Sequence, residues 1–158
     1  MFAVGIAMVG LIGAFTWRER AQAETTKVEE LTKICERGGM HHRRAAALRD
    51  LAELDSDASR AALGGLAESK DDRVAMQAIA ALGRVGSSSA RTKLAEIVGD
   101  EDRSELVRTM AVTAALRAEH RAGTSKTSVA DKFSSERGKC AALDDAAKAA
   151  QDHLWGKE

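Results

Sequence analysis

The chain has 158 residues, and its 24 Lys and Arg residues are balanced by 24 Asp and Glu residues. This net charge of zero argues against a nucleic-acid-binding protein, because such a protein normally carries a basic excess on its binding face. The chain has no Pro and only 3% aromatic residues, it is rich in helix-forming residues, and no segment shows the alternation of a strand, so we predict an all-α fold.

The first predicted element is an apolar helix at residues 2–17, FAVGIAMVGLIGAFTW. Such a helix would extend roughly 24 Å, somewhat less than the roughly 30 Å of a bilayer core. Trp17 suits a membrane interface, and Arg18 and Arg20 flank the C-terminal end of the apolar run, whereas no charged side chain precedes it. By the positive-inside rule, residues 1–20 are therefore predicted to be a single-pass membrane anchor that leaves the C-terminal domain in the cytoplasm.

Two other interpretations of this segment stay open. The triplet Ala21-Gln22-Ala23 resembles a signal-peptide cleavage site, which would make the chain a periplasmic or secreted protein. The third interpretation is a buried core helix, although a helix that is apolar on every face needs a larger protein around it. Within an anchor, Gly10 and Ala14 form a pair of small residues that would allow weak self-association.

Residues 21–40 are predicted to link this segment to the body of the chain. Within them, residues 24–37 place four apolar residues on one stripe of a helix, namely Val28, Leu31, Ile34 and Cys35. The glycine pair at 38–39 is expected to end that helix, because Gly readily adopts the left-handed cap conformation. Sustained heptads are missing, so we interpret the helix as a cap on the domain that follows rather than as a coiled coil.

Residues 41–123 contain a repeat of about one helix pair. Apolar residues recur at an offset of 31 positions, so that Ala47, Leu48, Leu51 and Leu54 match Ala78, Ile79, Leu82 and Val85, and Leu63 and Leu66 match Leu94 and Ile97. A weaker third copy contains Val107, Ala111 and Val112. Repeats of this length form stacked helical hairpins that bury their apolar faces against their neighbours. The predicted helices cover 41–54, 57–68, 72–84, 89–98 and 104–120. Asp102, with Glu105 three residues on, resembles a capping box at the start of the last of them.

Residues 124–158 are predicted to cap the C-terminal end of the stack. A polar helix at 126–135 supplies the solvent-exposed polar face that a terminal repeat needs. A last helix at 137–155 carries one apolar stripe, made of Cys140, Leu143, Ala147, Ala150 and Leu154. The alternative is a docking helix for a partner, with Leu154 and Trp155 as its anchors.

The stretch 71–102, DDRVAMQAIAALGRVGSSSARTKLAEIVGDED, resembles a short HEAT repeat of the kind found in phycobilisome-lyase-like proteins. The elements that carry the resemblance are Asp71, Asp72, Val74, Ala78, Leu82-Gly83, Leu94 and Ile97. The resemblance covers about residues 41–118 and implies a short α-solenoid of about three hairpins that binds proteins or peptides. It implies no chemistry, although some relatives act on chromophores. An auxiliary subunit or lyase acting on a prosthetic group is therefore one alternative function.

No combination of residues predicts catalysis, a metal site or a cofactor. Cys35 and Cys140 stand outside any CxxC pattern and are typical of small buried apolar residues. His41 and His42 are adjacent, and neighbouring side chains on a helix diverge by about 100°, so one ion seldom binds both. We therefore expect a protein that is not an enzyme and that holds neither metal nor cofactor.

The predicted binding site lies on the second helix of each hairpin. Arg60 and Arg91 occupy equivalent positions in successive second helices, and Lys93 and Glu96 share that side. Second helices line the concave face of HEAT-like solenoids, so the resemblance implies that these residues face a groove. Two arginines roughly 8–10 Å apart would suit an acidic peptide. The other interpretation is a pair of solvated surface charges.

These patterns together predict a membrane-tethered adaptor that holds a protein or peptide partner on a short α-solenoid. An exported protein of the same fold, cleaved after Ala23, is the first alternative, and a subunit acting on a prosthetic group is the second. The sequence does not identify the partner.

Overall fold

The computed structural model describes residues 4–37, 40–124 and 141–156. Over these residues the chain forms helices and no strand, as the composition predicts. The described helices are α1 (Val4–Glu36), α2 (His41–Leu54), α3 (Asp57–Ala67), α4 (Asp72–Val85), α5 (Ser88–Gly99), α6 (Glu105–Arg121) and α8 (Ala141–Trp155). Each helix of the repeat region begins and ends within one residue of its predicted bounds. The predicted helix at 126–135, and the first residues of the one predicted at 137–155, lie outside the described residues.

The N-terminal region differs from the prediction, because α1 is one continuous helix where two helices, 2–17 and 24–37, were expected. The residues between them, from Arg18 to Ala23, are all good or tolerable helix formers, and none is Gly or Pro. After Trp17 the side chains change from apolar to charged, but the helical backbone continues without a break.

Local hydrogen bonds explain where the helices of the repeat region begin. Ser56 caps α3, where its hydroxyl accepts from the Ser59 amide and the Ser59 hydroxyl accepts from the Ser56 amide. Asp71 caps α4 in a similar way. At α6, Asp102 was expected to be the cap, but the structure places Ser104 there, with its hydroxyl accepting from the Val107 amide. The Asp102 amide instead donates to the Asp100 carboxylate in the preceding turn.

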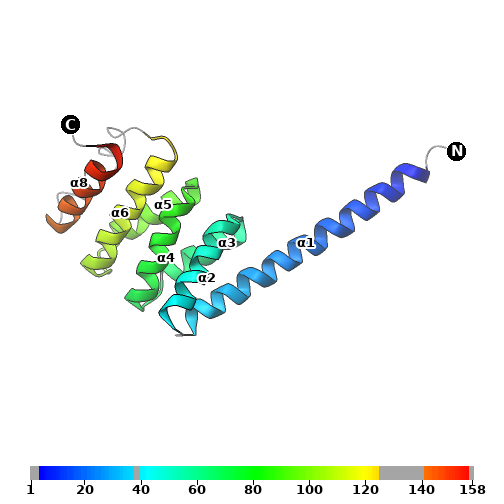
Figure 1. Cartoon of the computed structure of the whole chain (residues 1–158), viewed down its shortest axis with the longest axis horizontal. Coiled ribbons are helices and arrows are strands. Elements are labelled where there is room, and N and C mark those ends of the chain that lie inside the picture. Colours follow the sequence, from blue (N-terminus) through cyan, green and yellow to red (C-terminus); the bar gives the residue numbers. More distant parts are fainter. Residues whose placement is uncertain (1–3, 38–39, 125–140, 157–158) are drawn as a thin grey trace.

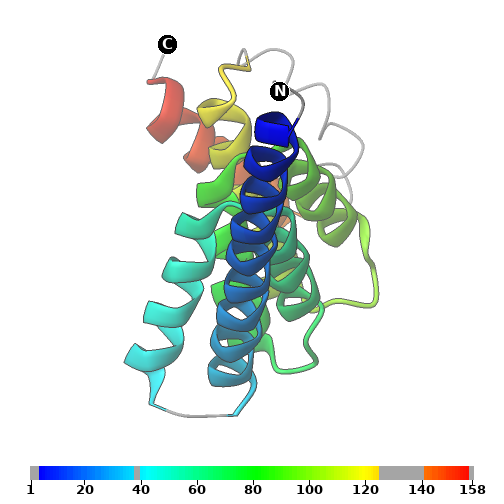
Figure 2. The same ribbon diagram turned by 90° about the vertical axis from the view of Figure 1, so that its right-hand side faces the viewer.

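The helices form two rows. In Figure 1, α2, α4, α6 and α8 lie side by side, and each contacts the next in this order. The second helices α3 and α5 form the other row, and the C-terminal part of α1 packs against α2 and α3. Figure 2 shows the rows end-on, with α1 in front and α2 (cyan) to one side. The N-terminal half of α1 extends away from the stack (Figure 1), and Arg18 to Ala23 are exposed.

The core joins the repeats into one unit. Most of the apolar residues that recur in the repeat are buried as predicted, among them Leu48, Leu51, Leu63, Leu66, Ile79, Leu82, Leu94, Ile97 and Val112. Leu54 and Val85 are half-buried and pack against this core. At the N-terminal end, Val28, Leu31 and Cys35 of α1 extend this core, in agreement with a capping helix. At the other end, Leu143 and Ala147 of α8 pack onto it.

At Gly83 of α4 two helices of the first row pack backbone against backbone. A Cβ atom built on Gly83 would lie 2.9 Å from the carbonyl oxygen of Ala114 and 3.0 Å from its Cα, both on α6. A side chain there would push the two helix backbones apart, so this glycine is required by packing. Gly86 is required for a different reason, because it ends α4 with a positive φ of 70°.

Candidate functional site

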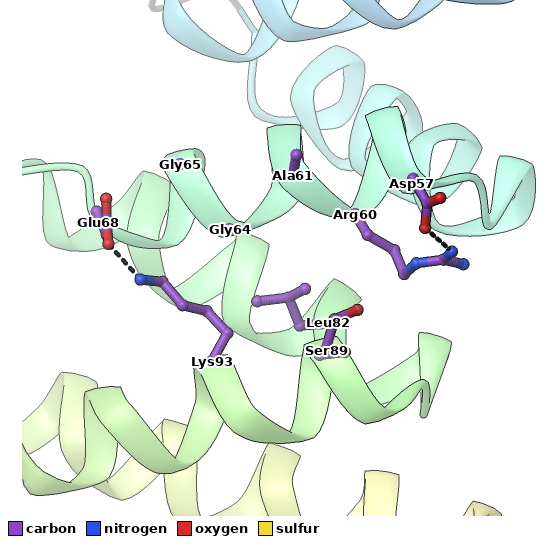
Figure 3. Close-up of a pocket in the computed structure, with 10 residues that line it drawn as sticks. Asp57, Arg60, Ala61, Gly64, Gly65, Glu68, Leu82, Ser89 and Lys93 are labelled. Carbon is purple, nitrogen blue, oxygen red and sulfur yellow. Dashed lines mark hydrogen bonds and ion pairs between the residues drawn. The ribbon is translucent and has the colours of Figure 1, made fainter.

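A groove lies between α3 and α5 on the second-helix face. It encloses a cavity of about 480 Å³, and Figure 3 shows the side chains around it. The lining residues come from α3 and its C-cap (Asp57, Arg60, Ala61, Gly64, Gly65 and Glu68), from α4 (Leu82) and from α5 (Ser89, Ala90 and Lys93). The face on which sequence analysis placed the binding site therefore does carry a cavity, and Arg60 and Lys93 line it.

The groove is open because the part of α3 that borders it has almost no side chains. Gly64 and Gly65 lie in the middle of the lining in Figure 3. At Gly65 an added Cβ would meet nothing within 4 Å, and at Gly64 it would meet only Cγ of Lys93, at 3.9 Å. Neither residue has a positive φ. Unlike Gly83, these two glycines are therefore not required by the fold.

One end of the groove is formed by Arg60 and two carboxylates. The guanidinium of Arg60 donates to Oδ1 of Asp55 at 2.7 Å, to the backbone carbonyl of Asp55 and to Oδ1 of Asp57. The hydrogen bonds to Asp57 and Asp55 raise the pKa of Arg60 above its ordinary value. Asp55 reaches this position because it ends α2 in the left-handed conformation, with a φ of 43°, which Asp tolerates better than most residues.

The other end is formed by Lys93, which also binds two carboxylates. Its ammonium donates to Oε1 of Glu68, across the groove, and to Oε2 of Glu96 at 3.1 Å, one turn further along α5. The hydrogen bond to Glu68 raises the pKa of Lys93, and the same hydrogen bond lowers the pKa of Glu68. At both ends, then, the cation of the groove is already neutralised by the protein.

Arg91 does not join Arg60 in the groove. Its guanidinium donates to Oε2 of Glu119 on α6 at 3.0 Å, and the Glu119 side chain is only 3% exposed. The hydroxyl of Thr124 donates to the same carboxylate oxygen at 2.8 Å. The pair therefore ties α5 to α6, and the expected stack of two arginines facing one peptide is not what the structure shows.

Glu96 and Lys93 also line a smaller cavity of about 270 Å³ that continues from the groove. Its further residues include Asp100 and Arg103, which form an ion pair at 3.5 Å. Arg103 also donates to the backbone carbonyl of Ser69 at 2.9 Å. Sequence analysis identified Arg60, Lys93 and Glu96 on this face. It missed the two glycines and the carboxylates of Asp55, Asp57 and Glu68, which bind the two cations. A detectable signal was the Gly64-Gly65 pair inside a helix, because the next repeat has Ala95 and Glu96 at the same positions.

The residues predicted to flank a membrane lie far from this groove. Arg18 and Arg20 are exposed on the part of α1 that extends from the stack, and the side chain of Trp17 lies outside the described residues. In the part of the chain that the structure describes, no helix has a stretch that is both long and apolar enough to cross a membrane.

Among the described residues no three His, Cys, Asp or Glu side chains gather in a way that would hold a metal ion. Cys35 is fully buried, and desolvation raises the pKa of its thiol to about 11. A thiol with so high a pKa supplies little thiolate near neutral pH and is a poor nucleophile. His41 bonds to Gln77 of α4 through Nε2 at 2.7 Å.

Comparison with known proteins agrees with this architecture. A family model described as HEAT repeats matches residues 28–117, which is more than half of the chain. This protein belongs to the HEAT repeat family. The match begins within α1, so it includes the C-terminal part of that helix together with the repeats. No curated protein and no solved structure matches the chain. HEAT repeats are in general a protein-interaction scaffold without enzymatic activity, and the more specific resemblance to phycobilisome-lyase-like repeats stays a prediction.

Proposed function

We propose that this HEAT-repeat protein is a non-enzymatic adaptor that holds a segment of a partner protein in the α3–α5 groove. The observation that carries the proposal is the pair Gly64-Gly65. Two glycines in the interior of a helix destabilise it, and here neither packing nor backbone conformation requires them. Sequences tend to keep such locally unfavourable choices at functional sites. In this chain their consequence is an open surface on which another chain can lie.

The size of the groove suits a peptide segment. The lining of α3 extends from Asp57 to Glu68, which at 1.5 Å per residue is roughly 16 Å. An extended peptide rises about 3.3 Å per residue, so about five of its residues would fit along this length. A partner helix of about three turns would cover the same distance.

The ionisable groups of the groove support a binding role rather than a catalytic one. The pKa of Arg60 and that of Lys93 are raised, and the pKa of Glu68 is lowered. All three shifts move the pKa values further from neutral pH. A general acid or base works best with a pKa near the working pH, so these residues are better suited to fixed charge contacts than to proton transfer.

A photo-cross-linker placed in the groove tests this proposal. Ala61 lines the groove and is exposed, so benzoylphenylalanine at position 61 should form an adduct with the bound partner in cells. Ala149 is exposed on α8, outside the groove, and is the matched control position. We expect one partner, identified by mass spectrometry, to be linked at 61 and not at 149. Equal adducts at both positions, or none at 61, would show that the groove is not the binding site.

We further propose that residues 2–17 tether the adaptor to a membrane. Their apolar composition and the arginines at 18 and 20 support this function. So does the exposure of α1 from Arg18 to Ala23, where the helix leaves the stack. A helix of sixteen residues would reach roughly 24 Å, less than the roughly 30 Å of a bilayer core, so such an anchor would tilt little. The helix that follows would then act as a short stalk between the membrane and the solenoid.

The alternative to a tether is export, with cleavage after Ala23. Residues 21–23 lie within the continuous helix α1. Intact-mass spectrometry of the protein purified from its own cells distinguishes the two functions directly. An N-terminus that retains residues 2–17 supports the tether, and an N-terminus at Glu24 supports export.

A further inference from the structure

We infer that the segment held in the α3–α5 groove is basic, with positively charged residues near both of its ends. The inference rests on the proposed function and specifies the chemistry of the partner. It reverses the expectation from sequence, in which arginines of the chain were to bind an acidic peptide.

The first argument is the balance of charge along the groove and its continuation. Three cations line it, Arg60, Lys93 and Arg103, and they are bound by five carboxylates, those of Asp55, Asp57, Glu68, Glu96 and Asp100. Four of these carboxylates line the groove or its continuation together with the three cations, so the lining carries an excess of one negative charge, and Asp55 adds a second beside Arg60. Such a surface concentrates cationic groups and disfavours anionic ones.

The second argument is which charges the solvent reaches. The side chains of the three cations are between 18% and 26% exposed, whereas those of the five carboxylates are between 43% and 101% exposed. Asp57 and Glu68, at opposite ends of α3, are the most exposed carboxylates that also line the cavity. An arriving segment would therefore meet carboxylate oxygens first, while the cations lie behind them.

The third argument is that binding an acidic peptide would require existing ion pairs to break. An acidic peptide would have to displace Asp55 and Asp57 from Arg60, or Glu68 and Glu96 from Lys93. Each displacement would break charge-assisted hydrogen bonds that already exist and leave the released carboxylates beside the incoming ones. A basic peptide needs no such rearrangement, because carboxylates have further lone pairs with which to accept.

The two glycines fit the same occupant. Lys and Arg side chains carry long apolar stems that lie along small residues while their charged ends reach a polar rim. Between the two acidic ends the groove offers Ala61, Gly64, Gly65 and Ala90. A segment with basic residues about five positions apart in an extended conformation would place its charges at both ends and its backbone over the glycines.

Three labelled peptides of one length test the inference by fluorescence anisotropy with the full-length chain in detergent. The first is Lys-Lys-Ala-Ser-Ser-Ala-Lys-Lys, and the other two replace every Lys by Glu or by Gln. We expect the lysine peptide to bind saturably, at least about tenfold more tightly than the glutamate peptide, and more weakly as salt is added. Tighter binding of the glutamate or glutamine peptide, or no saturable binding of the lysine peptide, would overturn the inference.

Substitutions locate the binding in the groove. Asp57→Asn with Glu68→Gln should weaken binding of the lysine peptide by about tenfold, whereas the charge-matched control Asp145→Asn with Asp152→Asn on α8 should not. Gly64→Ala with Gly65→Ala should weaken it too, without loss of thermal stability, whereas Gly99→Ala, at the end of α5 and outside the groove, should leave it unchanged. Binding that the acidic pair does not alter would contradict the inference.

The cross-linking experiment at position 61 reads out the proposed function separately. If a partner is linked there and its linked segment is acidic or neutral, the adaptor function holds and the basic segment is wrong. If no partner is linked at 61 although the lysine peptide binds, the groove has the inferred chemistry but the adaptor function fails.

Discussion

Two neighbouring residues of α4, Leu82 and Gly83, take part in contacts that hold the solenoid together. Leu82 is 1% exposed and belongs to both the common core and the wall of the groove. Its neighbour Gly83 faces the backbone of α6. One turn of α4 thus supports the core, the groove and the packing of the first row.

Leu82→Ala is expected to lower the free energy of unfolding by roughly 2–5 kcal/mol, because it removes buried methyl groups and leaves a cavity that α3 and α5 cannot close. That is a large part of the stability of a small domain. Urea denaturation followed by circular dichroism measures the change. A midpoint equal to that of the native sequence would mean that the register of α4 is misassigned.

Replacing a glycine by alanine should lower the stability at Gly83 and raise it at Gly64 and Gly65. Gly83→Ala places a methyl group 2.9 Å from the Ala114 carbonyl oxygen and should cost about 1–3 kcal/mol, the usual range for overpacking. Gly65→Ala meets open space and Gly64→Ala makes only an ordinary van der Waals contact with Lys93, so each should stabilise the chain by about 0.4–1 kcal/mol, through the lower entropy of the unfolded state. Thermal denaturation of the three single variants tests this. A loss of stability at 65 would imply an unseen contact on α3.

At the scale of helices, two arginines at equivalent repeat positions bind different partners because their local sequences differ. Arg60 has Asp55 and Asp57 nearby in sequence, and it binds both. The positions equivalent to these acids in the next repeat are Gly86 and Ser88, so Arg91 has no local acid. It reaches Glu119 on α6 instead. Register alone places both arginines on one helix face, and the neighbouring residues then decide where each side chain goes.

This difference predicts unequal effects of the same substitution. Arg91→Met removes a cationic partner from the buried Glu119 carboxylate and should cost about 1–3 kcal/mol, since a buried charge loses a hydrogen bond. Arg60→Met breaks ion pairs whose carboxylates are solvated and should cost less than about 1 kcal/mol. Chemical denaturation of both variants measures the difference. Equal losses would show that the Arg91–Glu119 pair does not stabilise the packing of α5 on α6.

At the scale of the whole molecule, α1 joins two parts with different surroundings. Its C-terminal part packs into the solenoid through Val28, Leu31 and Cys35. Residues 18 to 23 are exposed, and the apolar run precedes them. A continuous helix transmits orientation as well as distance, so a membrane attached at one end would hold the groove in a defined direction.

The proposed tether predicts the compartment of the C-terminal domain. A reporter enzyme fused after Glu158 should be active in the cytoplasm, and the fusion should stay with membranes in high salt, because the attachment is apolar and salt does not screen it. Replacing Arg18 and Arg20 by Gln should give mixed orientations, whereas Lys27→Gln, in the stalk, should not. Activity of the reporter only outside the cytoplasm would support export.

The sequence by itself determined the helices of the repeat region, their order and most of the core. Helical periodicity and the offset of 31 positions are local properties, and they correctly identified buried residues from Leu48 to Val112. Side-chain choices at the ends of helices were less well predicted, as Ser104 and not Asp102 caps α6. Capping depends on the turn before the helix, where the Asp102 amide donates to Asp100.

Only the tertiary structure decided the character of the groove. Periodicity places Arg60, Arg91 and Lys93 on one face, but it cannot show that Glu119 or Glu68 comes within hydrogen-bonding distance of a cation 25 or more residues away. Nor can it show that a Cβ atom would fit without crowding at Gly64 and Gly65 but would meet a helix backbone at Gly83. The physical reason is that charge pairing and close packing depend on distances between helices, whereas a sequence pattern specifies only which side of each helix a residue occupies.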